Sequence, residues 1–273
     1  MNILTMLLNK LSRVKSALNI TLPLQVRAGL LGFVDSTSRR RTNGELVPPL
    51  KMRRFIGQDQ DFFINRVPQL EKYCNLTPTD KVLDVGCGCG SLAISLIQYS
   101  NFKGNYEGFD IVSEFIDWLQ SNVTVRYPNF HFQHADVRNS GYNPNGKGVA
   151  SNYQFPYENG VFDIVFLGSV FTHMLPSDLE HYLSEISRVL KTNGKCLITY
   201  FLLTPDRRNI VDQPLRKQFK DTGKGYSVVD INIPENAVAY KQEYITKLYK
   251  KNGLKILKVE YGILQDLIAA IKQ

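Results

Sequence analysis

Residues 82–90 constrain the fold of this chain more than any other part of it. The run Val-Leu-Asp-Val has the pattern of a buried strand and is followed by glycines at alternate positions, Gly86, Gly88 and Gly90. A helical pattern begins at once with Ser91. Glycine can adopt positive φ, and the N-terminus of a helix offers backbone amides and a favourable dipole to a ligand. The stretch therefore predicts a ligand-binding turn between a strand and a helix.

The spacing of these glycines separates the turn from a dinucleotide site. A dinucleotide-binding turn follows the pattern G-x-G-x-x-G, and Ser91 occupies the place of its third glycine. Asp84 also lies two residues before the first glycine, near the end of the strand. A carboxylate there repels a pyrophosphate and favours a ligand that carries an ammonium group.

Strand and helix patterns alternate from Lys81 onward, which predicts an α/β fold with a parallel sheet covered on both faces. A turn at residues 191–194 is expected to end the helix before the fifth strand, with Gly194 as its C-cap. The expected strands are 81–85, 105–110, 130–134, 162–167, 195–202, 254–260 and 264–271, and the expected helices are 61–74, 91–100, 113–126, 177–190 and 241–251.

The remaining segments predict an N-terminal helical extension and lid over residues 1–75, before a domain over 76–273 with insertions near 139–160 and 204–239. Residues 33–70 otherwise read as an irregular connection. Leucines recur at helical spacing within residues 1–20, with lysines and arginines between them. Such a helix either packs on its own domain or makes peripheral contact with a membrane or a partner.

Composition narrows the classes of protein. The chain has 273 residues, 43% of them hydrophobic, and a formal net charge of +8. The charge is compatible with nucleic acid, anionic lipid or an acidic substrate, but the basic residues are dispersed. The four cysteines, Cys74, Cys87, Cys89 and Cys196, lack zinc spacing and are read as reduced thiols of a cytoplasmic protein. No segment has the roughly 18 consecutive apolar residues that a membrane span needs.

Acids also follow the second and third expected strands. Ligands of doubly wound sheets bind across the carboxyl ends of the strands, so these acids are expected near the glycine turn. Asp110 lies about 20 residues after Gly90, a spacing typical of an acid that binds ribose hydroxyls. Asp136 is placed to accept a hydrogen bond from an adenine amino group. Either acid alone is also explained as a helix cap or the start of a turn.

The combination of these motifs resembles the class I S-adenosylmethionine-dependent methyltransferase superfamily. The resemblance covers about residues 80–203 and the final strands. It implies a Rossmann-like seven-stranded sheet, mostly parallel with an antiparallel final strand, and S-adenosyl-L-methionine as the cofactor. The chain departs from the family at Thr192-Asn193-Gly194, where Pro-Gly-Gly is common. The residues expected to bind the cofactor are Asp84, Gly86, Gly88, Gly90, Asp110, Ile111, Asp136, Val137 and Gly168.

The segment Ser-Val-Phe-Thr-His at residues 169–173 resembles bacterial methyltransferases of small molecules, which implies methylation of an oxygen in a small metabolite or natural product. A hydroxyl acceptor must lose a proton, and His173 is the candidate base; a structural role in the loop is the alternative. Met174, Glu235 and Tyr240 are candidates for contact with a small-molecule or peptide-like acceptor. His131, His134 and His181 look structural, and no metal cluster is recognised.

Two other functions remain open. A nucleic-acid methyltransferase would use the positive charge, but the fourth strand is not followed by the Asp/Asn-Pro-Pro-Tyr/Phe segment of the enzymes that methylate amino groups in nucleic acids. Nucleic acid is therefore an unlikely partner. The other alternative is a membrane-binding or partner-binding protein that only retains the fold, prompted by the basic helix expected at residues 1–20.

Overall fold

The structure of the chain, a computed structural model, describes residues 46–57, 66–99, 101–204, 218–262 and 264–273. The chain divides into two compact units, Met1–Asp59 and Gln60–Gln273. The described part of the first unit contains a helix, α3 (Leu50–Phe55), that begins directly after Pro49. Proline is tolerated at the start of a helix because its missing N–H has no partner there, so this part of the expected irregular connection is helical. The helix expected within residues 1–20 lies outside the described residues.

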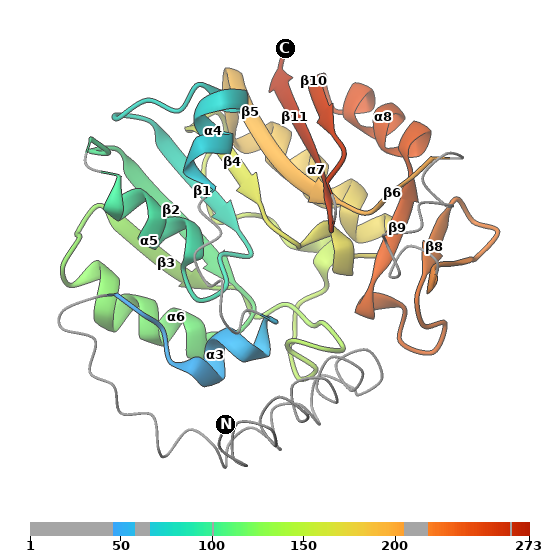
Figure 1. Ribbon diagram of the computed structural model, residues 1–273, viewed down its shortest axis with the longest axis horizontal. Coiled ribbons are helices and arrows are strands. Elements are labelled where there is room, and N and C mark those ends of the chain that lie inside the picture. Colours follow the sequence, from blue (N-terminus) through green and yellow to red (C-terminus); the bar gives the residue numbers. More distant parts are fainter. Residues whose placement is uncertain (1–45, 58–65, 100, 205–217, 263) are drawn as a thin grey trace, which may run out of the picture. The chain divides into compact units, whose positions relative to one another are not determined.

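The second unit is built on a seven-stranded sheet (Figure 1). Its order is β10-β11-β5-β4-β1-β2-β3. The strands from β5 to β3 are parallel, whereas β11 is antiparallel to both of its neighbours. The expected mostly parallel sheet with an antiparallel final strand is therefore confirmed. The strands are β1 (Lys81–Val85), β2 (Asn105–Asp110), β3 (Phe130–His134), β4 (Phe162–Leu167), β5 (Leu190–Tyr200), β10 (Leu254–Glu260) and β11 (Asp266–Lys272).

Helices cover both faces of this sheet, with α4, α5 and α6 on one face and α7 on the other (Figure 1). The expected helix over 113–126 is α6 followed by a π-helical turn, Gln120–Thr124. The helices of the second unit are α4 (Val67–Cys74), α5 (Ser91–Gln98), α6 (Ser113–Leu119), α7 (Pro176–Val189) and α8 (Gln242–Lys251), with 3₁₀ turns at Ala150–Asn152, Phe171–His173 and Pro234–Asn236.

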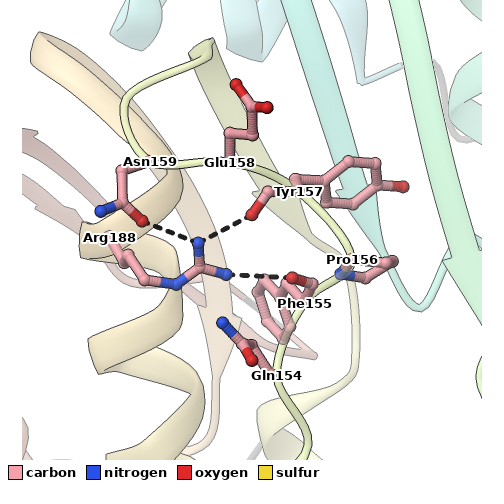
Figure 2. A pocket seen from close by; sticks show the side chains of 7 residues that line it. All are labelled: Gln154, Phe155, Pro156, Tyr157, Glu158, Asn159 and Arg188. Atoms are coloured by element: carbon pink, nitrogen blue, oxygen red, sulfur yellow. Dashed lines mark hydrogen bonds between the residues drawn. The ribbon is translucent and has the colours of Figure 1, made fainter.

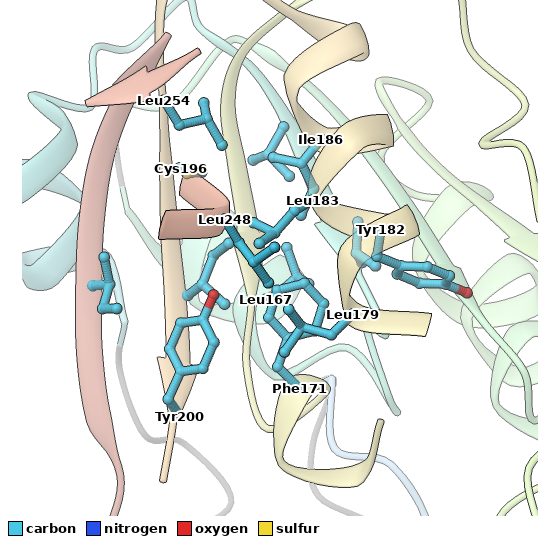
Figure 3. Close-up of a cluster of buried hydrophobic side chains, with 14 of the residues drawn as sticks. Leu167, Phe171, Leu179, Tyr182, Leu183, Ile186, Cys196, Tyr200, Leu248 and Leu254 are labelled. Carbon is cyan, nitrogen blue, oxygen red and sulfur yellow. The ribbon is translucent and has the colours of Figure 1, made fainter. Parts of the chain in front are cut away.

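The core lies between the sheet and the helices α7 and α8 (Figure 3). Leu179, Leu183 and Ile186 recur at helical spacing along α7 and are fully buried. They pack with Leu167 of β4 and Tyr200 of β5 in one cluster. Burying one such side chain contributes about 1.5–3 kcal/mol, so the apolar stripe of α7 holds this helix on the sheet.

The exit from α7 differs from the expected turn capped by Gly194. The helix ends at Val189, and Leu190 is already extended and pairs with Phe162 of β4. The register then shifts within β5, where the left-handed residue is Asn193 with φ 65°. A Cβ at Gly194 would lie 3.0 Å from the carbonyl oxygen of Phe162. Glycine is needed there because two backbones approach closely inside the sheet.

The segment after β5, expected as a polar insertion, forms a second sheet in its described part. The order of this sheet is β6-β9-β8-β7, and β9 pairs in parallel with β6. The pairing attaches the late segment to the chain that leaves the carboxyl end of β5. Its strands are β6 (Leu202–Leu203), β7 (Lys220–Asp221), β8 (Tyr226–Val228) and β9 (Val238–Lys241).

None of the helices that the structure describes is long and apolar enough to cross a membrane. The four cysteines are buried free thiols. Burial raises the pKa of the Cys87 thiol in the glycine turn, because the thiolate would have to be desolvated.

Candidate functional site

The glycine turn lies at the carboxyl end of β1, between the ends of β4 and β2. Gly86, Gly88 and Gly90 have φ values of 71°, 54° and 89°. A Cβ at Gly86 would lie 2.4 Å from Cγ2 of Val170, in the loop after β4. The turn thus requires glycine for its backbone conformation and, at Gly86, for close contact with the neighbouring loop.

Asp110 ties the end of β2 to the glycine turn. Its carboxylate accepts the N–H of Gly88 at 2.8 Å and the N–H of Val112 at 2.9 Å. Burial raises the pKa of Asp110, although these backbone hydrogen bonds oppose the rise. A carboxylate offers about four acceptor positions, so these backbone bonds leave Asp110 room to accept a hydrogen bond from a ligand.

Asp84 lies inside the sheet instead of facing an open surface. Its carboxylate is 2% exposed and accepts the hydroxyl of Tyr106 on β2 at 2.7 Å. Burial raises the pKa of Asp84 to about 7; the Tyr106 hydroxyl opposes this shift and the charge of Asp110 adds to it. Near neutral pH, Asp84 is therefore divided between its protonated and ionised forms.

Asp84→Asn should abolish a pH-dependent loss of stability. The folded-state pKa of about 7 lies above the unfolded value of about 3.9, so the folded state holds an extra proton between them. The stabilisation from that proton is complete below about pH 4 and is lost as pH rises through 7. Asn still accepts the Tyr106 hydroxyl, so the variant should be more stable than the parent by about 2–4 kcal/mol at pH 8, but not at pH 4. Urea unfolding at both pH values measures this, and an equal difference at both would contradict it.

Asp136 and Val137 come just after β3, and their side chains lie in different surroundings. Asp136 is exposed, with its carboxylate 3.5 Å from Nδ2 of Asn143. Val137 is 2% exposed and belongs to the main core. The backbone of Ile111, beside Asp110, accepts a hydrogen bond from Nε2 of His134 at 3.2 Å.

The loop after β4 begins with Gly168 and carries strain at Ser169. Ser169 has φ 63°, an uncommon conformation for a residue with a side chain. Its N–H donates to Oγ1 of Thr199 on β5 at 2.7 Å, and its hydroxyl donates to Gln265 at 3.0 Å. These bonds fix the loop beside the glycine turn.

His173 lies at the end of this loop, in the 3₁₀ turn Phe171–His173, and its side chain is partly exposed. Its Nδ1 lies 2.9 Å from the backbone carbonyl oxygen of Glu235. A carbonyl oxygen only accepts, so Nδ1 carries the proton and Nε2 of the neutral ring keeps its lone pair. Burial lowers the pKa of His173, although the hydrogen bonds to the backbone of Glu235 and Asn236 and the charge of Glu235 oppose this. The neutral ring therefore prevails at pH 7.

The residues expected to contact the methyl acceptor gather around His173, but the polar groups of two of them are hydrogen-bonded within the protein. The Glu235 carboxylate accepts the N–H of Ser140 at 2.9 Å. The Tyr240 hydroxyl donates to the backbone carbonyl of Met174, and the Tyr240 side chain is fully buried. Met174 is partly buried against the main core. The structure thus brings His173, Met174, Glu235 and Tyr240 together from two distant segments.

Tyr142 belongs to the same group and was not predicted. Its ring meets the His173 ring edge-on, with centroids 5.3 Å apart and planes at 76°. The side chain of Asn139 accepts the N–H groups of Gly141 and Tyr142, which forms the turn that presents the ring. The Asn-Ser-Gly-Tyr-Asn run signals a turn in the sequence, but nothing in it indicates contact with His173.

A pocket lined by residues 154–159 and Arg188 lies elsewhere (Figure 2). Its residues precede β4 and β5, so it is near the amino ends of these strands. Each N–H of the Arg188 guanidinium already has a partner: both oxygens of Glu185, the carbonyls of Phe155 and Tyr157, and the side chain of Asn159. Arg188 fastens the earlier insertion to α7 and has no donor left for a ligand.

Among the residues that the structure describes, no group of three or more His, Cys, Asp or Glu side chains is placed to hold a metal ion. The groups that converge at the carboxyl edge of the sheet are carboxylates, a glycine turn and one neutral imidazole.

Comparison with known proteins extends these observations. Residues 76–253 match the methyltransferase domain family. The 2-phytyl-1,4-naphtoquinone methyltransferase of Trichormus variabilis is 25% identical over 174 residues, which are 63% of this chain and 65% of that protein. The tRNA N(3)-cytidine methyltransferase METTL2 of Gallus gallus is 28% identical over 130 residues, 47% of this chain and 32% of that protein. The matches span less than two thirds of either relative.

A solved structure shows the same fold. Human N-acetylserotonin methyltransferase in complex with SAM superposes with a TM-score of 0.56 at 17% sequence identity, over 82% of this chain and 55% of that one. Together with the family match over more than half of the chain, the glycine turn and the order of the seven strands, this places the chain in the methyltransferase domain family of the class I S-adenosylmethionine-dependent methyltransferases.

Proposed function

We propose that this chain transfers a methyl group to an oxygen atom of a small molecule, with His173 as the base. The observation that carries the proposal is the bond from Nδ1 of His173 to the carbonyl of Glu235, which leaves the lone pair on Nε2. His173 lies in the loop that follows β4, at the edge of the sheet where ligands of this fold bind. A hydroxyl that donates to Nε2 can lose its proton as the new bond forms.

The residues at the glycine turn fit S-adenosylmethionine. The acids Asp84, Asp110 and Asp136 lie at or near the ends of three neighbouring strands, an arrangement that suits a cationic nucleoside without phosphate. Asp110 keeps acceptor positions for ribose hydroxyls, and Asp136 is exposed for an adenine amino group. Asp84 is buried, so we assign it an electrostatic effect on a nearby ammonium group.

When bound, S-adenosylmethionine supplies a methyl group that is already activated by its sulfonium. The protein therefore has to align the acceptor, exclude water and take up one proton. His173 takes the proton, and the Tyr142 ring beside it offers an apolar wall for an acceptor.

Similar proteins support a small acceptor, since one is named for a naphtoquinone and the human protein is named for N-acetylserotonin. The second candidate acceptor is RNA, because a tRNA methyltransferase is also among the relatives and the net charge is +8. Transfer of labelled methyl groups from S-adenosylmethionine to a panel of phenols, alcohols, quinols, carboxylic acids and tRNA distinguishes them. Labelling of tRNA alone would overturn the proposal.

Asp110→Ala should weaken the binding of S-adenosylmethionine by about 1.5–3 kcal/mol, roughly 10-fold to 150-fold, because a hydrogen bond to a charged acceptor is lost. Calorimetry with the cofactor and with its demethylated product measures this. Asp117→Ala is the matched control, since Asp117 is an exposed acid on the neighbouring helix α6. Unchanged affinity in Asp110→Ala, or binding of NAD in place of S-adenosylmethionine by the parent, would contradict the assignment.

A further inference from the structure

We propose that Glu235 is a positioning residue: its carboxylate anchors the turn Pro234–Asn236, so that its own backbone carbonyl holds the His173 ring with the proton on Nδ1. The inference rests on the proposed function, in which His173 is the base. Glu235 was expected to contact the methyl acceptor, yet its carboxylate and its backbone carbonyl both accept hydrogen bonds within the protein. The positioning role explains these two bonds.

The first contact is made by the side chain. Oε2 of Glu235 accepts the N–H of Ser140 at 2.9 Å, across 95 residues of sequence. A hydrogen bond to an ionised acceptor is stronger than a neutral one. The bond joins the late segment to the turn formed by residues 139–143 of the earlier insertion.

The second contact is made by the backbone of the same residue. The carbonyl of Glu235 accepts the Nδ1–H of His173 at 2.9 Å, across 62 residues. Glu235 is the middle residue of a 3₁₀ turn that is closed by the N–H of Asn236 on the carbonyl of Ile233. In so short a turn, a side-chain anchor also fixes the direction of the adjoining carbonyl.

The two contacts converge on one ring. The turn that supplies the Ser140 N–H also presents Tyr142, whose ring flanks His173. The imidazole is therefore held by Glu235 through Nδ1 and by Tyr142 at its side. Without the anchor, the carbonyl of Glu235 would no longer be held against Nδ1, so either ring nitrogen of His173 could carry the proton.

The nitrogen of His173 that carries the proton can be identified by ¹⁵N NMR, and this measurement does not require that the methyl acceptor be known. The chain has four histidines, so ¹⁵N-histidine labelling gives few signals, and the His173 signal is assigned from its loss in His173→Gln. The parent should show His173 as the Nδ1–H form. Glu235→Ala should lose that form as the dominant species, whereas Glu235→Gln, whose amide oxygen can still accept the Ser140 N–H, should keep it.

Asp230→Ala is the matched control. Asp230 is another acid of the late segment, and its side chain accepts the N–H of the nearby Asn232 at 2.9 Å. It should leave the His173 tautomer unchanged. Retention of the Nδ1–H form in Glu235→Ala, with native circular dichroism, would overturn the inference; so would its loss in Glu235→Gln while that variant remains folded.

The inference about Glu235 and the proposed function can fail independently of each other. Once an acceptor is found, Glu235→Ala should lower kcat while the KM for S-adenosylmethionine stays nearly unchanged, and Glu235→Gln should restore kcat. If His173→Ala keeps full turnover, the base assignment fails, yet the tautomer measurement still decides whether Glu235 positions the ring.

Discussion

His173→Ala should lower the turnover number by about 10²–10⁴-fold, the range for loss of a general base, while the affinity for S-adenosylmethionine is nearly kept. The reason is geometric: Nδ1 donates to the Glu235 carbonyl, so removal of the ring removes Nε2, the nitrogen that carries the lone pair. Steady-state kinetics with an acceptor from the panel and calorimetry with the demethylated cofactor measure the two quantities.

The pH dependence of the same reaction has a definite sign. Burial lowers the pKa of His173 from the ordinary value of 6.5, so the neutral base persists below that pH. The rate should be constant near neutrality and fall with acid only below about pH 6.5. The acid limb that belongs to His173 should be absent in His173→Ala.

His181→Ala is the control for loss of an imidazole. His181 lies on α7 and donates from Nε2 to the carbonyl of Tyr153 at 2.9 Å, so it serves the structure. Its replacement should cost stability and leave turnover near the parental value. A near-normal rate and pH profile in His173→Ala would remove His173 from the mechanism and leave alignment of the reactants as the main catalytic device.

Arg188→Met should reduce the free energy of unfolding by about 3–5 kcal/mol, because it leaves a largely buried carboxylate without its charged partner. Glu185 is 7% exposed, and both of its oxygens accept from Arg188, at 2.8 and 2.6 Å. In the variant, the carboxylate of Glu185 would keep the N–H of Phe155 as a donor. Urea unfolding at pH 7 measures the loss.

The pH dependence of this effect follows from Glu185. Burial alone would raise the pKa of Glu185, but the bonds from Arg188 and the Phe155 N–H outweigh it and lower the pKa. The stabilisation is therefore present above the unfolded pKa of about 4.3 and is lost as pH falls through the folded value. The difference between parent and Arg188→Met should shrink in acid.

Lys251→Met is the control for the loss of a cation. Lys251 pairs with Glu180 at 3.3 Å, and both side chains are exposed to solvent, by 69% and 39%. An exposed pair contributes about 0.2–1 kcal/mol, so this variant should change stability little. A loss in Arg188→Met no larger than in Lys251→Met would show that Arg188 does not fasten the insertion to α7.

The sequence was sufficient for the local elements and their order. The strands β1 to β4 span the residues expected for them. β4 is a nearly continuous buried run inside the sheet, whereas β3 lies at its edge and alternates between buried and exposed residues at its start. The glycine turn was equally readable, since only glycine suits three positive φ angles in five residues. The helix α3 and the strands of the late segment were missed, because short elements with few apolar residues depend on their neighbours for stability.

Only the tertiary structure decided which side chains share a site and which are already bonded within the protein. Sequence order could not show that Asp84 faces Tyr106, that Val137 is packed in the core, or that Tyr240 is buried against Met174. Nor could it show that Glu235 meets Ser140 and His173, since these contacts join residues 95 and 62 positions apart. Residue types and spacing along a strand or helix determine local conformation, whereas contacts between distant loops arise only when the sheet brings their ends together.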